Sequence, residues 1–246
     1  MNPMPGAPYP GIRPFREDEE FLFFGREAQV DAMVDTLARG RFLAVIGSSG
    51  CGKSSLVNCG LRPALHRGLL TRAGSAWRMA SCRPGGNPLR ALAAALAAPE
   101  VLGSTAPSGP FSQAELIEAT LAMSRLGLVE AWRQAALPAG TRLLVIVDQF
   151  EELFRYRNLA DQSEDGDPAT AFVNLLLEAR AQDVPIYIVL TMRSDFLGDC
   201  ARFAGLPEAI NGGQYLVPRM SRDERRAAIQ GPARVCGADI APTLLT

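Results

Sequence analysis

The sequence is short of the residues on which several protein classes depend. It contains one histidine, and its five cysteines are irregularly spaced without a Cys-x-x-Cys pair, so a structural zinc site has no ligand set. The longest apolar runs, residues 91–98 and 143–147, fall short of the ~20 residues that a membrane-spanning helix needs. A net charge of −1 removes the simplest argument for nucleic-acid binding. We therefore expect neither a membrane span nor a nucleic-acid partner.

The N-terminal residues also lack a basic run followed by an apolar core, which is the pattern of a secretory signal. Scattered, unpaired cysteines are typical of proteins in a reducing compartment. The sequence therefore predicts a cytoplasmic protein.

Lysine is almost absent. Of the 25 positively charged residues, only Lys53 is a lysine, and all the others are arginines. An ammonium is a compact charge with rotating donors, whereas a guanidinium is wide and planar, so Lys53 marks a position where arginine does not fit. The guanine-selecting motif [NT]KxD would need a second lysine, and this argues against a GTPase.

What the chain does contain is an alternation of apolar runs with segments of helical periodicity. Continuous apolar runs of this kind indicate the buried strands of a parallel sheet that is covered on both faces. The predicted strands are 42–46, 77–80, 143–147 and 186–190, with a shorter one at 215–217. The predicted helices include 27–40, 53–60, 88–98, 172–181, and two that open with capping boxes at Ser112 and Ser221, the second ending at Gly231-Pro232. The fold class is therefore α/β.

The segment GSSGCGKS at 47–54 fits the phosphate-loop pattern GxxxxGK[ST], and it follows a predicted strand and opens a predicted helix. Its glycines permit backbone angles that turn the loop amides inward around an anion, and the helix N-terminus adds its dipole. Lys53 supplies charge to the terminal phosphates, and the Ser54 hydroxyl is a ligand for Mg²⁺. The candidate nucleotide-binding residues of this loop are Gly47, Ser48, Ser49, Gly50, Cys51, Gly52, Lys53, Ser54 and Ser55.

Asp148 ends an apolar strand, where a carboxylate holds Mg²⁺ opposite the loop hydroxyl. Many ATPases place a glutamate directly after this aspartate, but here the position holds Gln149. Glu151 and Glu152 are the remaining candidates for orienting the attacking water. Alternatively, they are acidic residues that stabilise a helix N-terminus.

Two further segments have open interpretations. Arg193 follows the run 186–190 and either contacts the γ-phosphate or pairs locally with Asp195. Aromatic and arginine residues at 13–15 and 24–26 (Phe24, Gly25 and Arg26) either cover an adenine or form an apolar strap over the helix that follows.

Six segments together resemble the nucleotide-binding module of the bacterial STAND NTPases, and among these the group called novel STAND NTPase 1. They are PYPGIRPF at 8–15, FFGRE at 23–27, FLAVIGSSGCGKSSLV at 42–57, LLVIVDQFEELF at 143–154, LTMRSDF at 190–196 and AIQGPA at 228–233. The resemblance covers nearly the whole chain, and the first and fourth segments carry most of its specificity.

The resemblance implies an AAA+-like P-loop ATPase core that acts as a molecular switch, exchanges ADP for ATP and self-associates. It makes Asp148 the Walker B acid, places Arg193 at the sensor-1 position, and puts Phe24, Gly25 and Arg26 near adenine. It implies ATP or ADP and Mg²⁺ as cofactors, and sensor and effector domains outside this chain. The expected domains are an N-terminal strap at 1–27, an NTPase core at 28–220 and the start of a helical lid at 221–246.

Two other functions remain open from the sequence. A small-molecule kinase would use the same loop to transfer phosphate. A nucleotide-binding scaffold would hold the nucleotide without hydrolysing it, and Gln149 in place of a glutamate is compatible with that.

Overall fold

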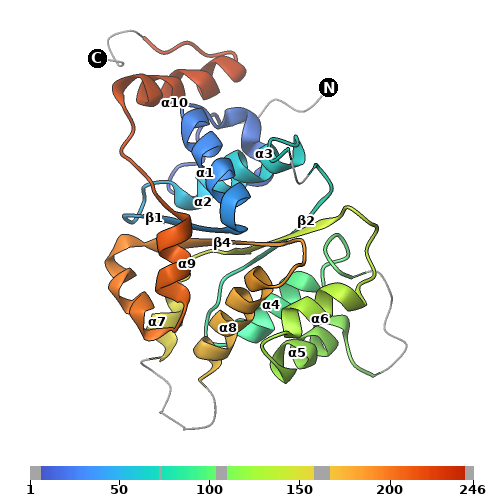
Figure 1. The fold of residues 1–246 in the computed structure, drawn as a ribbon. Coiled ribbons are helices and arrows are strands. Elements are labelled where there is room, and N and C mark those ends of the chain that lie inside the picture. The colour runs from blue at the N-terminus through green and yellow to red at the C-terminus, as the bar shows by residue number, and fades with distance from the viewer. Residues whose placement is uncertain (1–6, 72–73, 104–109, 158–166, 242–246) are drawn as a thin grey trace.

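Five parallel strands form the centre of the part of the chain that the structure describes (Figure 1). The structure is a computed structural model that describes residues 7–71, 74–103, 110–157 and 167–241. The strands lie in the order β2-β3-β4-β1-β5, and every neighbouring pair is parallel. Their bounds are β1 Phe42–Gly47, β2 Trp77–Cys82, β3 Arg142–Val147, β4 Ile186–Arg193 and β5 Gln214–Leu216. The predicted α/β class is confirmed.

The central strands are apolar throughout because both of their faces are buried. In β1, Phe42, Ala44 and Ile46 pack into the larger core below the sheet, whereas Leu43 and Val45 pack into a second core above it. The strands β3 and β4 alternate between the two cores in the same way. Successive side chains of a strand point to opposite faces, so an uninterrupted apolar run is what a sheet covered on both sides requires.

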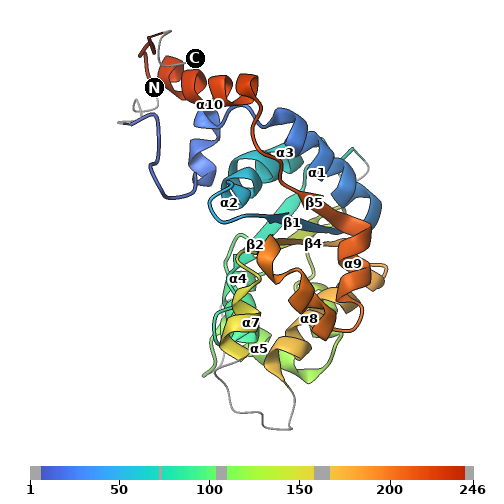
Figure 2. The same cartoon turned by 90° about the vertical axis from the view of Figure 1, so that its left-hand side faces the viewer.

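Helices cover both faces of the sheet (Figures 1 and 2). On one face lie α1 (Glu27–Gly40) and a continuous helical stretch made of α2 (Lys53–Ser55), a π-helical turn (Leu56–Leu61) and α3 (Arg62–His66). On the other lie α4 Pro88–Leu96, α5 Gln113–Met123, α6 Gly127–Gln134, α7 Glu152–Arg157, α8 Pro168–Ala181 and α9 Leu206–Gly213. The last helix, α10 (Arg222–Val235), lies beyond α1 and away from the sheet.

Several predicted boundaries were wrong, and three of them concern the phosphate loop's helix, β4 and the last helix. The helix after the glycine loop runs to His66 instead of residue 60, through the π-helical turn. Strand β4 continues three residues beyond the predicted 190, because Thr191 to Arg193 pair with the end of β1. Helix α10 does not end at Gly231-Pro232 but continues to Val235, since main-chain bonding resumes beyond the proline, where Cys236 N donates to Pro232 O at 3.1 Å.

Both predicted capping boxes are confirmed, at Ser112–Glu115 and at Ser221–Glu224. Residues 1–6 of the expected strap and 242–246 of the expected lid lie outside the described residues. In the described part of the chain, no helix is both long enough and apolar enough to cross a membrane.

Candidate functional site

The glycine loop lies between β1 and α2, at the carboxyl edge of the sheet. Gly50 and Gly52 have φ angles of +74° and +91°, which residues with side chains rarely adopt. Apart from their chain neighbours, no described atom lies within 4 Å of where their Cβ atoms would be. Lys53 reaches back across the loop, where its Nζ donates to Gly47 O at 3.0 Å and to Ser48 O at 2.8 Å. The loop is thus an open cradle with one ammonium held across it. Ser48 and Ser49 are exposed on this loop, and Cys51, Ser54 and Ser55 are half-buried.

Asp148 is the hydrogen-bonding centre of this edge. Its Oδ1 accepts the Ser54 hydroxyl at 2.8 Å and the Thr191 hydroxyl at 2.6 Å. Its Oδ2 accepts Arg83 Nε at 3.4 Å and Nη2 at 3.3 Å. The strand order explains this convergence, because β4 lies between β1 and β3 and brings Thr191 between the loop and the aspartate.

Thr191 also fixes the turn that follows Asp148. Its hydroxyl accepts the Gln149 N–H at 3.0 Å, and its carbonyl accepts the Phe150 N–H at 2.9 Å. Gln149 takes a φ of +58°, a conformation that costs a non-glycine residue free energy and that these two bonds stabilise. Thr191 was missed as a site residue. The available signal was a short polar side chain inside an otherwise apolar buried strand.

The two candidate glutamates have different surroundings. Glu151 is 6% exposed, lines the same cavity as Lys53, and accepts the Arg193 N–H at 3.3 Å. Glu152 begins α7, accepts the Gly85 N–H at 3.0 Å, and does not line that cavity. Of the two, only Glu151 borders the cavity that the phosphate loop lines.

Arg193 makes the local contact with Asp195 that was one of its two predicted alternatives. Its guanidinium also borders the cavity beside the loop, and its Nε is buried without a partner among the described residues. The structure therefore brings Arg193 to the site while leaving part of its donor capacity unused.

This cavity has a volume of about 710 Å³. Its sheet side is formed by the loop and by the ends of β2, β3 and β4. Its opposite wall is formed by residues 9–15 together with Ala228 of α10. Residues 9–15 of the strap are held at both of their ends, because Phe15 N donates to Ser55 Oγ at 3.1 Å and the Tyr9 hydroxyl donates to Ile229 O at 2.5 Å.

An ion pair stiffens the strap next to this wall. Arg13 Nη1 donates to Glu19 Oε2 at 2.7 Å, and this hydrogen bond lowers the pKa of Glu19 to about 2. Glu19 in turn accepts the Arg16 N–H at 2.8 Å. The Glu19 carboxylate stays ionised at neutral pH and holds the bend that leads from residues 9–15 into the 3-10 helix Glu17–Leu22.

Phe24, Gly25 and Arg26 are not brought to the phosphate loop. Phe24 and Arg26 border a separate cavity of about 440 Å³, and Arg26 Nη1 donates to Pro218 O at 3.1 Å. A Cβ on Gly25, whose φ is +78°, would lie 2.3 Å from Glu224 O. The structure therefore places this segment against the beginning of α10, and its contact with adenine stays a prediction.

The sequence profile of the family described as Novel STAND NTPase 1 matches residues 8–246. The chain belongs to this family. No curated protein matches the sequence significantly. As a novel STAND NTPase 1 protein, the chain is a P-loop nucleotide-binding module with an AAA+-like fold.

Solved structures share this fold. The Aeropyrum pernix ORC1 protein, solved in complex with DNA, has a TM-score of 0.55 and 16% identity over 88% of this chain and 51% of its own. The Aeropyrum pernix ORC2 protein, in its ADP form, has a TM-score of 0.52 and 15% identity over 97% of this chain and 56% of its own. The STAND chain thus spans about half the length of these structures.

The donor set at the centre of this STAND site fits Mg²⁺. Ser54 and Asp148 offer a hydroxyl and a carboxylate, which are the hard oxygen ligands that Mg²⁺ prefers. Within the described ranges, no group of three or more His, Cys, Asp or Glu side chains could hold a metal by itself. Such a sparse set suits a cation that takes its remaining ligands from water and phosphates.

Proposed function

We propose that this chain is the ATP- and ADP-binding switch module of a signal-transduction protein, with slow Mg²⁺-dependent hydrolysis. The observation that carries the proposal is the hydrogen bond of 2.8 Å between Ser54 and Asp148, beside Lys53. It joins the end of the phosphate loop to an acidic strand end more than ninety residues away in the sequence. In P-loop NTPases these two groups flank the magnesium of the bound nucleotide.

The residues around the cavity divide into a phosphate end and a base end. At the phosphate end, loop amides and Lys53 bind the phosphates, while Ser54 and Asp148 hold Mg²⁺, which neutralises charge on the terminal phosphates when bound. At the base end, Tyr9 to Phe15 and Ala228 bound a space open to an adenine. From the family resemblance, Phe24, Gly25 and Arg26 extend this end.

For hydrolysis we favour Glu151 as the residue that orients water. It is buried at the wall of the cavity that Lys53 also lines, whereas Glu152 accepts the Gly85 N–H and does not line this cavity. Arg193 is the candidate γ-phosphate sensor, and a phosphate oxygen would satisfy its unpartnered donor. Because Gln149 replaces the glutamate directly after Asp148, turnover is expected to be slow.

The switch itself would use the contact of α10 with the strap. The Tyr9 hydroxyl donates to Ile229 O of α10, and Arg26 Nη1 donates to Pro218 O in the linker before α10. Gln29 Nε2 of α1 donates to Glu224 Oε1 of α10 at 2.6 Å. Figure 2 shows α10 on the same side of the sheet as α1. These contacts support a division into a strap at 1–27, an NTPase core at 28–220 and the start of a helical lid at 221–246. The proposal also includes self-association of the module and sensor and effector domains outside this chain. It places the protein in the cytoplasm.

The first test is to denature protein purified without added nucleotide and to identify what is released by ion-exchange chromatography. Near-stoichiometric ADP is expected for a resting switch. Nucleotide added to emptied protein should stabilise the fold by about 4 kcal/mol at a thousandfold excess over its dissociation constant. The absence of any melting shift with ATP or ADP would sink the proposal.

Substitutions of Glu151 and Glu152 distinguish a slow ATPase from a scaffold that binds ATP without hydrolysing it. Glu151→Gln should abolish phosphate release and retain ATP, with Glu152→Gln as the matched control that keeps turnover. Undetectable phosphate release by the wild-type protein despite tight ATP binding would favour the scaffold, for which the neutral side chain of Gln149 is the supporting observation.

A further inference from the structure

Arg83 comes to the phosphate end of the cavity through the register of the sheet. It follows Cys82, the last residue of β2, which pairs with Val147 of β3. The Asp148 N–H donates to Cys82 O at 2.9 Å, so the residues after the two strands emerge side by side. Nothing in the local sequence of Arg83 marks it, because its role depends on this pairing.

The backbone that carries Arg83 is anchored while its side chain is not. Gly85 N donates to Glu152 at 3.0 Å, and Asn87 caps α4 by accepting the Arg90 N–H at 3.0 Å. The Arg83 side chain is 55% exposed and borders both the large cavity and an adjoining one of about 280 Å³. The guanidinium therefore has space to move around a fixed Cα.

Its contact with Asp148 is loose. Distances of 3.3 and 3.4 Å exceed the ~2.7–2.9 Å of a good charge-assisted hydrogen bond. By contrast, the two hydroxyls on the other carboxylate oxygen bind at 2.8 and 2.6 Å. Arg83 is thus the weakly held partner of Asp148, and its donors are available to another anion nearby.

We propose that Arg83 is a specificity-determining residue that donates to the terminal phosphate of a nucleoside triphosphate. A divalent cation beside Asp148 repels the guanidinium, and the γ-phosphate attracts it. A diphosphate ends nearer the loop and leaves Arg83 on Asp148. Arg83 would therefore favour the triphosphate over the diphosphate. This inference rests on the proposed nucleotide site.

The test compares the dissociation constants of ADP and of a non-hydrolysable ATP analogue by titration calorimetry, with Mg²⁺ at constant salt. Arg83→Gln should weaken the ATP analogue about tenfold, as expected for a lost charge-assisted hydrogen bond, and leave ADP within about twofold. Arg78→Gln is the matched control, because Arg78 lies near the other end of β2 and its guanidinium donates to Glu100 O away from the cavity. It should change neither constant.

Equal weakening of both nucleotides, or no change, would overturn the role of Arg83. If the wild-type protein binds neither nucleotide, the proposed function fails instead, so the two failures are distinguishable. Should Arg83→Gln not fold, as judged by its melting curve, Arg83→Lys replaces it. The lysine keeps the charge but loses the fork, and a smaller loss confined to the ATP analogue is expected. An unchanged ratio for that variant would equally overturn the inference.

Discussion

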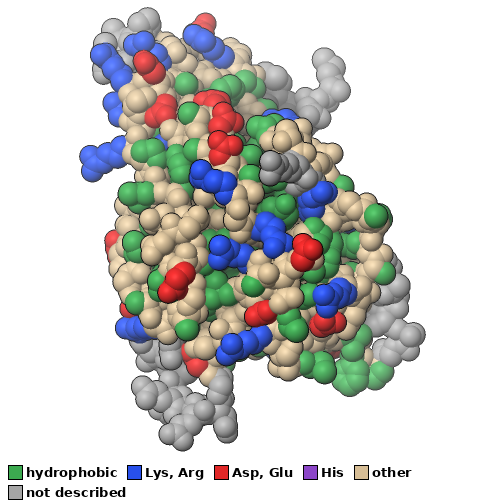
Figure 3. Space-filling model, viewed as in Figure 1, with side chains coloured by type: hydrophobic (Ala, Val, Ile, Leu, Met, Phe, Trp, Pro, Cys, Tyr) green, Lys and Arg blue, Asp and Glu red, His purple; other side chains and the backbone are tan. Residues whose placement is uncertain are grey.

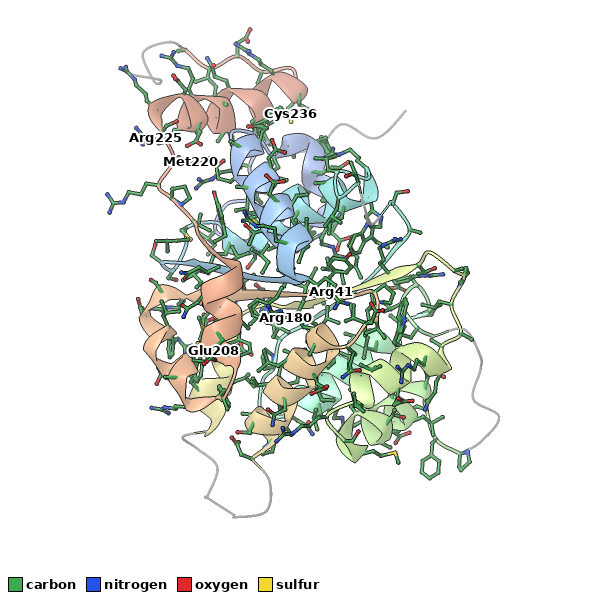
Figure 4. The ribbon with its side chains drawn as sticks, viewed as in Figure 1. Arg41, Arg180, Glu208, Met220, Arg225 and Cys236 are labelled. Atoms are coloured by element: carbon green, nitrogen blue, oxygen red, sulfur yellow. The ribbon has the colours of Figure 1, made fainter. Side chains whose placement is uncertain are left out.

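The two edges of the sheet both carry arginines, but the arginines have different partners. At the amino edge, Arg41 donates to the carbonyls of Arg180 at 2.9 Å, of Gln182 at 2.8 Å and of Val184, and Arg180 donates back to Gly40 O at 3.1 Å. Figure 4 labels Arg41 and Arg180 side by side there, and Figure 3 shows basic side chains at the centre of the same face. At the carboxyl edge, Arg83 contacts a carboxylate that has other partners.

The type of acceptor separates structural from functional arginines. Arg41 binds three neutral main-chain carbonyls, two of which, Gln182 O and Val184 O, also accept main-chain N–H groups, and these contacts hold its unfavourable φ of +53°. A carboxylate at a phosphate-binding edge binds exchangeable partners, including a metal ion. We expect changes at the amino edge to lower stability, and changes at the carboxyl edge to lower binding.

Lys53 should give the largest effect on binding. Lys53→Ala and Lys53→Arg should both weaken ATP and ADP about a hundredfold or more, because the phosphates lose a charge in one case and meet an oversized guanidinium in the other. Fluorescence or calorimetric titration checks this, with an unchanged melting temperature without nucleotide as the control. Tight binding by Lys53→Arg would refute the reason given for the single lysine.

Asp148→Asn should raise the dissociation constant of ATP in the presence of Mg²⁺ about tenfold or more, because the amide is a weaker ligand for a hard cation. Binding measured in excess chelator should stay near the wild-type value. If titrations with and without Mg²⁺ differ as much as in the wild-type protein, Asp148 does not serve the metal.

Arg41→Ala tests the amino edge. It should lower the free energy of unfolding by about 2–3 kcal/mol, because three hydrogen bonds from a charged donor to main-chain carbonyls are lost. For a chain of this size that corresponds to a melting temperature about 5–10 °C lower. The ratio of ATP to ADP affinity should not change, and a selective loss of ATP binding would contradict the division between the two edges.

The smallest expected effect is a difference in labelling rate between the buried and the half-buried cysteines. Burial raises the pKa of Cys59, Cys82 and Cys200 to about 12 each, so these thiols should react slowly with iodoacetamide near neutral pH. Half-buried Cys51 and Cys236 should label first. Nucleotide should protect Cys51, in the phosphate loop, and leave Cys236 reactive (Figure 4 labels Cys236, which follows the last residue of α10). Mass spectrometry of the labelled peptides measures this, and equal protection of both would contradict the proposed site.

Much of the site could be predicted because its signals are local. The glycine spacing around Lys53 and the acid after an apolar run are properties of short segments, and both lie at the predicted edge. Arg83 could not be found in this way, since its role depends on which strands are neighbours. Thr191 had a local signal, a polar side chain in an apolar strand, but its partner Asp148 follows from the strand order. The segment Phe24 to Arg26 was predicted near adenine, whereas its observed contacts are with α10 and the linker before it.

The alternation of strands and helices, the loop that turns its amides inward, and the single ammonium at its end are all encoded locally in the sequence. These follow from backbone preferences and from burial on both faces of a strand. Three features come from the three-dimensional packing instead: β4 lies between β1 and β3, Glu151 borders the cavity while Glu152 does not, and Arg83 contacts Asp148. Such contacts join segments far apart in the chain, and they arise only when the strands pair in one order and register.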